Sequence, residues 1–213
     1  MGWMVFDQYA VKYDRWYDEH RRLYQAEGDA LGRFIPPAGL GVEIGAGTGR
    51  FAAPFGIKFG IEPSRRMAEI AQGRGLAVCQ AMGEALPFPD DRFDFALLVT
   101  VICFVDDVAT LLQETWRVLK PGGRLILGFI DRNSALGRLY ESRKESDSFY
   151  RQARFYAAGQ VADDVLQAGF DRLEFCQTLS GLPGEAPEIE PVRAGYGEGA
   201  FVVLSARKRE QGG

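Results

Sequence analysis

Three glycines and an acid are concentrated in one short stretch of this 213-residue chain. Gly45, Gly47 and Gly49 follow the acid Glu43, which lies in a short apolar run. Glycine lets a backbone turn sharply and lets a ligand approach the main chain closely, and the first N–H groups of a following helix are free to bind that ligand. We therefore expect a ligand-binding turn that ends a strand and opens a helix.

A second acid stands where a partner of such a turn is expected. Glu62 ends the next apolar run and is followed by Pro63-Ser64. In doubly wound α/β folds, an acid at this place accepts hydrogen bonds from the ribose hydroxyls of a nucleotide. The turn and this acid together predict a site for a nucleotide-like ligand at the carboxyl ends of neighbouring strands.

Two classes of ligand fit this arrangement. The motif Gly47-x-Gly49-x-x-Ala52 satisfies the dinucleotide fingerprint, which predicts a nicotinamide oxidoreductase with Glu62 on the ribose. However, the first glycine of this motif and Glu62 are only fifteen residues apart, where about twenty is usual. A carboxylate at Glu43, pointing into the crevice, would repel a pyrophosphate and attract a ligand that carries an ammonium group. S-adenosylmethionine is such a ligand.

Short apolar runs alternate with helical patterns along the chain, which is typical of an α/β fold with a doubly wound, Rossmann-like sheet and helices on both faces. The runs predict strands at 41–44, 59–61, 76–79, 95–99, 124–130, 173–176 and 200–204. Helices are expected from Ser64 to Gly73 or Gly75, from Asp106 or Asp107 to Lys120, and from Gln160 to Ala168. Most runs do not alternate polar with apolar residues, which indicates strands buried on both faces.

The two ends of the chain differ from this middle. Residues 7–34 form an aromatic-rich helical segment, 131–156 are polar and basic, and 179–199 are rich in proline and glycine and predict a long loop. We find no repeat or linker that divides the chain, so one domain over 1–213 is expected. It comprises the N-terminal segment 7–34, a cofactor-binding core over 38–130, and a substrate-side insertion with the C-terminal strands over 131–213.

Composition and charge exclude several other classes. The net charge of -4 removes the main argument for a nucleic-acid or membrane partner, because phosphate binding needs a surplus of Lys and Arg. His20 is the only histidine and is expected on an exposed polar helix face, so no multi-histidine zinc site can form. The three cysteines form no CxxC pair, so no metal site is predicted. We expect a cytoplasmic protein with a small-molecule substrate, and the sequence leaves its oligomeric state open.

Four motifs follow one another along the chain. They are Val42-Glu43-Ile44-Gly45-Ala46-Gly47-Thr48-Gly49, Gly60-Ile61-Glu62-Pro63-Ser64-x-x-Met67, Gly83-Glu84-Ala85-Leu86-Pro87-Phe88-Pro89-Asp90-Asp91-Arg92-Phe93-Asp94 and Arg117-Val118-Leu119-Lys120-Pro121-Gly122-Gly123. With them the chain resembles the class I S-adenosylmethionine-dependent methyltransferases, in particular the type 11 methyltransferase domain group. The resemblance implies S-adenosylmethionine as cofactor and a mostly parallel sheet with an antiparallel C-terminal strand. It places cofactor contacts at Tyr13, Glu43, Gly45, Ala46, Gly47, Gly49, Glu62, Pro63, Ser64, Met67, Met82, Gly83, Glu84 and Thr100.

Within this resemblance the residues take different roles. Glu43 and the glycines hold the methionine moiety, Glu62 binds the ribose, and residues 63–67 flank the adenine. Met82 stands where many relatives place an aspartate against the adenine amino group, so apolar and backbone contacts are expected there. Residues 100–104 lack the histidine that relatives often have after the fourth strand, so no acid-base role is carried over to them.

The resemblance also implies that residues 7–34 act as a lid, with Tyr13 as the expected contact. Asp131, at the end of the fifth strand, is the other candidate for catalysis. The basic run 132–154 suits either an acidic substrate or a solvated helical face. In methyl transfer from a sulfonium the protein contributes mainly proximity and alignment. Three functions stay open: a small-molecule methyltransferase, a nicotinamide oxidoreductase, and a non-enzymatic cofactor-binding protein, the last because no base is evident.

Overall fold

The computed structural model describes residues 2–181 and 191–209, and within them eight strands form one sheet. The strands are β1 (Gly41–Ile44), β2 (Phe59–Ile61), β3 (Ala77–Cys79), β4 (Phe93–Val99), β5 (Leu119–Ile130), β6 (Phe170–Thr178), β7 (Arg193–Ala194) and β8 (Phe201–Lys208). Their order is β3-β2-β1-β4-β5-β8-β6-β7. β1 to β5 pair in parallel, and β8 runs antiparallel to β5 and β6. This confirms the predicted sheet with its antiparallel C-terminal strand.

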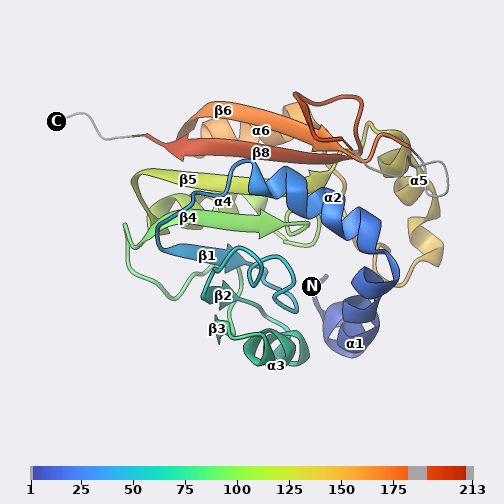
Figure 1. The fold of residues 1–213 in the computed structure, drawn as a ribbon, viewed down its shortest axis with the longest axis horizontal. Coiled ribbons are helices and arrows are strands. Elements are labelled where there is room, and N and C mark those ends of the chain that lie inside the picture. Colours follow the sequence, from blue (N-terminus) through green and yellow to red (C-terminus); the bar gives the residue numbers. More distant parts are fainter. Residues whose placement is uncertain (1, 182–190, 210–213) are drawn as a thin grey trace.

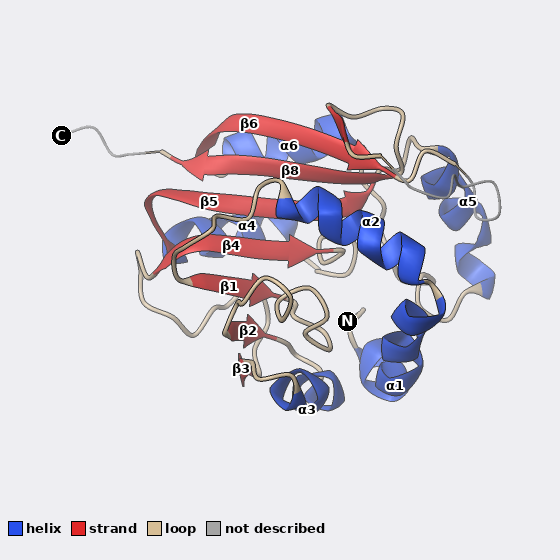
Figure 2. Ribbon diagram, in the orientation of Figure 1, coloured by secondary structure: helices blue, strands red, loops and turns tan. Residues whose placement is uncertain are grey.

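Helices cover both faces of the sheet (Figure 1). They are α1 (Met4–Glu19), α2 (Arg21–Gly32), α3 (Arg65–Gly73), α4 (Val108–Val118), α5 (Ala135–Arg143), the short 3-10 helix η1 (Lys144–Ser146) and α6 (Ala158–Gln167). Figure 2 shows α4 and α6 behind the sheet and α2 in front of it. α1 and α5 lie beyond the carboxyl ends of the parallel strands, where folds of this kind bind their ligands.

Side chains of β4 show why the central strands are buried on both faces. Leu98 belongs to the core that packs against α4 and α6, whereas Leu97 and Val99 belong to the core under α2. Successive strand residues point to opposite faces, so an apolar run without alternation fills both cores. β3 is an exception to the predicted burial, because it lies at the edge of the sheet and leaves Cys79 exposed.

Two helices begin at the caps that the sequence predicts. Ser64 Oγ accepts a hydrogen bond from Met67 N at the start of α3. Asp107 Oδ1 accepts one from Thr110 N at the start of α4. Each cap satisfies an N–H group that has no partner within its helix, which fixes where the helix begins.

The segment after the glycine turn corrects one expectation, because it is not a helix. Residues 50–56 form turns between β1 and β2. Pro54 donates no N–H to a helix, and Gly56 adopts a left-handed conformation with φ +69°. These two residues leave too little chain for helical hydrogen bonds to propagate.

β5 begins at Leu119, earlier than the predicted Arg124. The predicted helix stop, residues 120–123, does end α4, but it is part of the strand rather than a separate loop. The pairing of β4 with β5 shifts register between Phe93 and Phe95, so an irregularity in the ladder accommodates these residues.

The aromatic segment 7–34 forms two helices rather than one. α1 is kinked at Tyr9, and His20 separates α1 from α2. The His20 ring stacks on Trp16 with 4.2 Å between ring centroids, and its Nδ1 lies 2.8 Å from Trp16 O. His20 is therefore half-buried at a helix junction and not on an exposed polar face.

The predicted loop 179–199 contains the short strand β7, which pairs with β6. Residues 182–190 of this prediction lie outside the described residues. In the described ranges, each helix is too short or too polar to cross a membrane.

A cluster of charges fastens α1 to the loops beneath it. Asp14 accepts hydrogen bonds from Arg50 at 2.9 and 3.0 Å and from Arg74 at 2.8 Å. Although burial opposes the shift, these hydrogen bonds hold the pKa of Asp14 below its ordinary value. Asp18 meets Arg50 as well, but its side chain is more than half exposed.

We expect Asp14→Ala to lower the free energy of unfolding by about 1–3 kcal/mol, because two partly buried guanidinium groups each lose a charged acceptor. Asp18→Ala is the control and should cost clearly less, because solvent screens an exposed ion pair. The pKa of Asp14 is depressed in the folded state, so its stabilisation is present above the unfolded value of 3.8 and is lost as the pH falls below it. Thermal unfolding at neutral and acidic pH measures both effects, and equal losses for the two variants would contradict this ranking.

Candidate functional site

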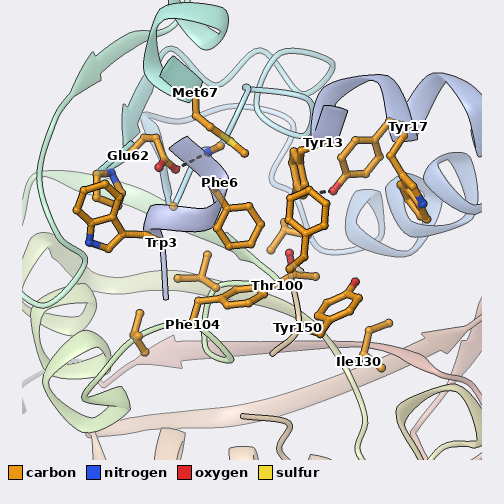
Figure 3. A pocket seen from close by; sticks show the side chains of 18 of the residues that line it. Trp3, Phe6, Tyr13, Tyr17, Glu62, Met67, Thr100, Phe104, Ile130 and Tyr150 are labelled. Atoms are coloured by element: carbon orange, nitrogen blue, oxygen red, sulfur yellow. Dashed lines mark hydrogen bonds between the residues drawn. The ribbon is translucent and has the colours of Figure 1, made fainter. Parts of the chain in front are cut away.

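A cavity of about 450 Å³ lies at the carboxyl ends of β1, β2 and β4, below α1 (Figure 3). This volume is in the range of ordinary small-molecule sites. The glycine turn and the end of β2 form one wall, the segment after β4 forms a second, and side chains of α1 form a third. The cavity therefore joins segments that are far apart in the sequence.

Most residues that the sequence predicts for the cofactor line this cavity. They are Tyr13, Gly45, Gly47, Glu62, Pro63, Met67, Met82, Gly83, Glu84 and Thr100. The remaining predicted residues, Glu43, Ala46, Gly49 and Ser64, are buried and do not line it. They support the residues that do.

The glycine turn is held against the end of β2 by backbone hydrogen bonds. The N–H groups of Gly45 and Ala46 both donate to Ile61 O at 2.8 Å. Gly47 N donates to Glu62 Oε2, also at 2.8 Å. Gly47 has φ +52°, and a Cβ placed there would lie 3.6 Å from Met67 Sδ. A side chain at this position would thus project among the side chains that line the cavity.

Glu43 does not point into the crevice, which corrects the sequence-based expectation. Val42 and Ile44 point into the core under α4, so Glu43 between them points to the opposite face, beneath the turn. It is 1% exposed, and its Oε2 accepts a hydrogen bond from Ala52 N at 2.9 Å. Burial raises the pKa of Glu43 well above its usual value. Its direct contact in this structure is with the backbone that follows the turn.

Gly49 lets the turn pack against α3 and does not line the cavity. Its φ is +77°, and a Cβ there would lie 3.2 Å from Ala71 Cβ on α3. The missing side chain lets the turn and α3 pack closely.

Of the two acids Glu43 and Glu62, it is Glu62 that lines the cavity. Besides Gly47 N, its carboxylate accepts a hydrogen bond from Ser64 N at 2.8 Å. Burial raises the pKa of Glu62 to about 7, although both backbone donors oppose this shift. Ser64 lies behind it, where its hydroxyl caps α3 and donates to Asp7 Oδ1 of α1 at 2.8 Å.

Two polar side-chain atoms of the lining are fully buried without a hydrogen-bond partner within the described residues. They are Trp3 Nε1 and Glu84 Oε2, whereas the other carboxylate oxygen of Glu84 accepts from Asp106 N. Buried polar atoms in proteins are normally paired, so unpaired ones in a cavity indicate a polar ligand. Met82 and Gly83 lie beside Glu84 in the lining.

α1 closes the cavity with aromatic side chains, as the sequence predicts for part of them. Tyr13, Trp16 and Tyr17 line it, and the hydroxyls of Tyr13 and Tyr17 lie 2.7 Å apart. Phe6, which the sequence analysis missed, projects into the middle of the view in Figure 3. Tyr9 does not line the cavity and packs against Phe149 instead.

The segment after β4 forms the opposite wall. Thr100 adopts a left-handed conformation with φ +54°, and its N–H donates to Gly128 O at 2.8 Å. Cys103 lies behind this wall, where its Sγ contacts Thr100 O at 3.1 Å. Burial raises the pKa of the Cys103 thiol to about 12, so the thiol is neutral and poorly nucleophilic at neutral pH.

Asp131 does not line the cavity, which corrects its assignment as a candidate for catalysis. It is 2% exposed, and its Oδ1 accepts hydrogen bonds from Asn133 N at 3.0 Å and Ala158 N at 3.3 Å. The carboxylate ties the end of β5 to the starts of α5 and α6. This position follows from its backbone donors, which the sequence does not reveal.

The basic run 132–154 contributes no arginine or lysine to the lining. The same segment contributes Leu136 and Tyr140 from α5 and Tyr150 after η1, none of which was predicted from the sequence. Glu27 on α2 also lines the cavity and was not predicted. A signal for Glu27 was present, because Glu27 stands four residues after Leu23 and four before Leu31, within an apolar helix face.

Comparisons with known proteins agree with this fold. A family model described as a methyltransferase domain matches residues 42–127. An uncharacterized protein of Methanocaldococcus jannaschii is 47% identical over 204 residues, which cover 96% of this chain and 98% of that protein. An uncharacterized protein of Mycobacterium tuberculosis is 39% identical over 203 residues, which cover 92% of this chain and 71% of that protein.

A solved structure from Thermotoga maritima is similar over the whole of its length. It is described as an S-adenosylmethionine-dependent methyltransferase and a possible histamine N-methyltransferase. It is 50% identical to this chain, covers 98% of it, and superposes with a TM-score of 0.95. The chain therefore belongs to the class I S-adenosylmethionine-dependent methyltransferases.

Proposed function

We propose that this protein binds S-adenosylmethionine in the cavity below α1 and transfers its methyl group to a small-molecule acceptor. The observation that carries the proposal is the arrangement of Gly47 and Glu62, which face one cavity and are hydrogen-bonded to each other. In this proposal Glu62 accepts hydrogen bonds from the ribose hydroxyls, and the backbone of the glycine turn supports the methionine moiety.

The residues present fit this cofactor. Met67 and Met82 offer apolar contacts for an adenine ring, and the unpaired Glu84 Oε2 offers an acceptor for an amino group. The bound cofactor supplies a reactive methyl group on a positive sulfur, so the chain itself needs mainly to align the acceptor and exclude water. α1, with Tyr13, covers the cavity in this proposal as a lid.

The geometry disfavours a nicotinamide oxidoreductase. A pyrophosphate binds the free N–H groups of a helix that opens directly after the glycine turn. In the described structure, residues 50–56 form turns at this place, so that helix N-terminus is missing. The motif Gly47-x-Gly49-x-x-Ala52 thus occurs without the structural context that the dinucleotide reading requires.

Glu62→Ala is expected to weaken the binding of S-adenosylhomocysteine, the product of the cofactor, by about 10- to 100-fold, because the ribose hydroxyls lose a charged acceptor. Glu69→Ala is the control, since Glu69 is exposed on α3 and pairs only with Arg65 among the described residues. The pKa of Glu62 is raised by burial to about 7 and the carboxylate is the accepting form, so affinity should fall from about pH 8 to about pH 6.

Isothermal titration calorimetry measures the affinity of the wild type, Glu62→Ala and Glu69→Ala for S-adenosylhomocysteine. A wild-type chain that binds neither S-adenosylmethionine nor S-adenosylhomocysteine would overturn the proposed function. Equal affinities of the wild type and Glu62→Ala would remove Glu62 from the site.

A further inference from the structure

One carboxyl group of the cavity lining has no hydrogen-bond partner among the described residues. Glu27, on α2, lines the cavity and is 7% exposed. Within residues 2–181 and 191–209 it makes no hydrogen bond or ion pair. A buried carboxylate without a partner is costly, so a group of this kind points to a ligand that completes it.

The other acids of the lining have partners, which sets Glu27 apart. Glu62, Glu84 and Asp147 each accept at least one hydrogen bond from a backbone N–H. Lys12 is the only basic residue among the described lining residues, and its side chain is exposed beside the rings of α1 and the segment after η1. No charge on the described chain compensates Glu27.

Aromatic rings line the same cavity as this carboxyl group. Tyr13 and Tyr17 of α1, Tyr140 of α5 and Tyr150 after η1 line the same cavity. Burial raises the pKa of each of these four tyrosines, and the charge of Glu27 raises each further, so all four lie within its electrostatic reach. Aromatic faces attract cations, and a buried carboxylate is stable when it pairs with one.

Glu27 and the proposed cofactor residues lie on different elements. Figure 3 shows Glu62 and Trp3 on one side of the cavity and Tyr17 and Tyr150 on the other. We propose that Glu27 and the four tyrosines form the subsite that binds the protonated amine group of the methyl acceptor. The proposal rests on the proposed function and names the acceptor class for the same cavity. A neutral or an acidic acceptor would leave Glu27 without the ion pair that a protonated amine provides.

Binding of a cation beside Glu27 changes the protonation of its carboxyl group. Burial alone raises the pKa of Glu27 to about 8, so without a ligand the group is mostly protonated at neutral pH. An ammonium ion favours the carboxylate, so its binding releases the carboxyl proton to the solvent. The four tyrosines line the cavity with Glu27 from α1, α5 and the segment after η1, and Cys176 of β6 contacts α2 at Ala30 O. All five have raised pKa values and stay neutral at neutral pH.

The test is calorimetric titration of the full chain saturated with S-adenosylhomocysteine. The amine probes are 2-phenylethylamine and tyramine, and the matched neutral and acidic probes are 2-phenylethanol and phenylacetate. We expect an amine probe to bind at least about tenfold more tightly than 2-phenylethanol, because only the amine pairs with Glu27. Phenylacetate should bind more weakly than either.

Glu27→Gln keeps the size of the side chain and removes its charge. We expect this variant to lose at least about tenfold in amine affinity while its affinity for S-adenosylhomocysteine stays within about twofold of the wild type. Asp29→Asn is the matched control, because Asp29 is exposed on the same helix and does not line the cavity. It should change neither affinity. Melting temperatures of all three chains report whether the variants fold.

A second measurement uses the wild-type chain and needs no variant. Its amine affinity should rise about tenfold between pH 6 and pH 7, since one proton leaves as the amine binds. The observed heat of binding should also differ between phosphate and Tris buffers, because each buffer takes up the released proton with its own heat of protonation.

Three results would overturn the amine subsite. They are equal amine affinity in the wild type and Glu27→Gln, equal affinity for 2-phenylethylamine and 2-phenylethanol, and no binding of either amine by a chain that does bind S-adenosylhomocysteine. If S-adenosylhomocysteine itself does not bind, the proposed function fails and the amine subsite fails with it. The two failures are therefore distinguishable.

Discussion

The Gly47→Val variant is expected to bind S-adenosylhomocysteine at least about 100-fold more weakly than the wild-type chain, a loss of about 2.8 kcal/mol. Gly47 has φ +52°, a conformation that valine adopts only under strain. The added side chain would also approach Met67 Sδ and the ring of Tyr13, and so occupy space in the cavity. Calorimetric titration measures the loss.

Gly56→Val separates the two causes of that loss. Gly56 has a similar left-handed conformation, with φ +69°, but a Cβ there meets nothing within 4 Å. Both variants should therefore lose about 1–2 kcal/mol of stability through backbone strain. Only Gly47→Val should lose binding. If Gly56→Val lost binding as strongly, the effect would come from the fold of the turn and not from the cavity.

Gly137→Ala is expected to lower the free energy of unfolding by about 2–4 kcal/mol, which for a chain of this length lowers the melting temperature by roughly 5–15 °C. A Cβ on Gly137 would overlap the carbonyl oxygen of Asp131 and lie 2.9 Å from Arg132 Cα. These are backbone atoms and cannot move aside as a flexible side chain can. α5 would have to shift, and it carries Leu136 and Tyr140 into the cavity.

Gly159→Ala is the matched control for that variant, because it also places a methyl group in the first turn of a helix. Gly159 lies in α6, and a Cβ there meets nothing within 4 Å. We expect this variant to gain about 0.4–1 kcal/mol, since alanine restricts the unfolded chain more than glycine does. Thermal unfolding compares the two, and similar melting temperatures would refute the close approach of α5 to the end of β5.

Much of the fold could be predicted because its signals are local. The apolar runs of the central strands fill two cores, and Ser64 and Asp107 cap the helices that follow them. The glycine turn and Glu62 were found for the same reason, since each lies within a few residues of a strand end. Parallel strands bring such ends to one edge of the sheet, so sequence order alone indicated where the cavity lies.

The wrong predictions have a common physical cause. The local sequence encodes neither the direction in which a side chain points nor its hydrogen-bond partner. Glu43 was expected in the crevice, but the pleat of β1 turns it beneath the turn, where it binds Ala52 N. Asp131 follows β5 at its carboxyl end, as predicted, but its carboxylate accepts hydrogen bonds from the backbone N–H groups of residues 133 and 158. A position at a strand end predicts only the region of the fold in which a residue lies. The packing of the structure decides which side chains line the cavity.

The sequence by itself therefore determined the class of fold and the end of the cavity proposed for the cofactor. Only the tertiary structure decided the other end, where Glu27, Tyr140 and Tyr150 meet Tyr13 and Tyr17. These residues come from α1, α2, α5 and the segment after η1, and no spacing in the chain relates one of these elements to another. They meet because each helix buries its apolar face against the sheet or a neighbouring helix, and this packing brings distant side chains around one space.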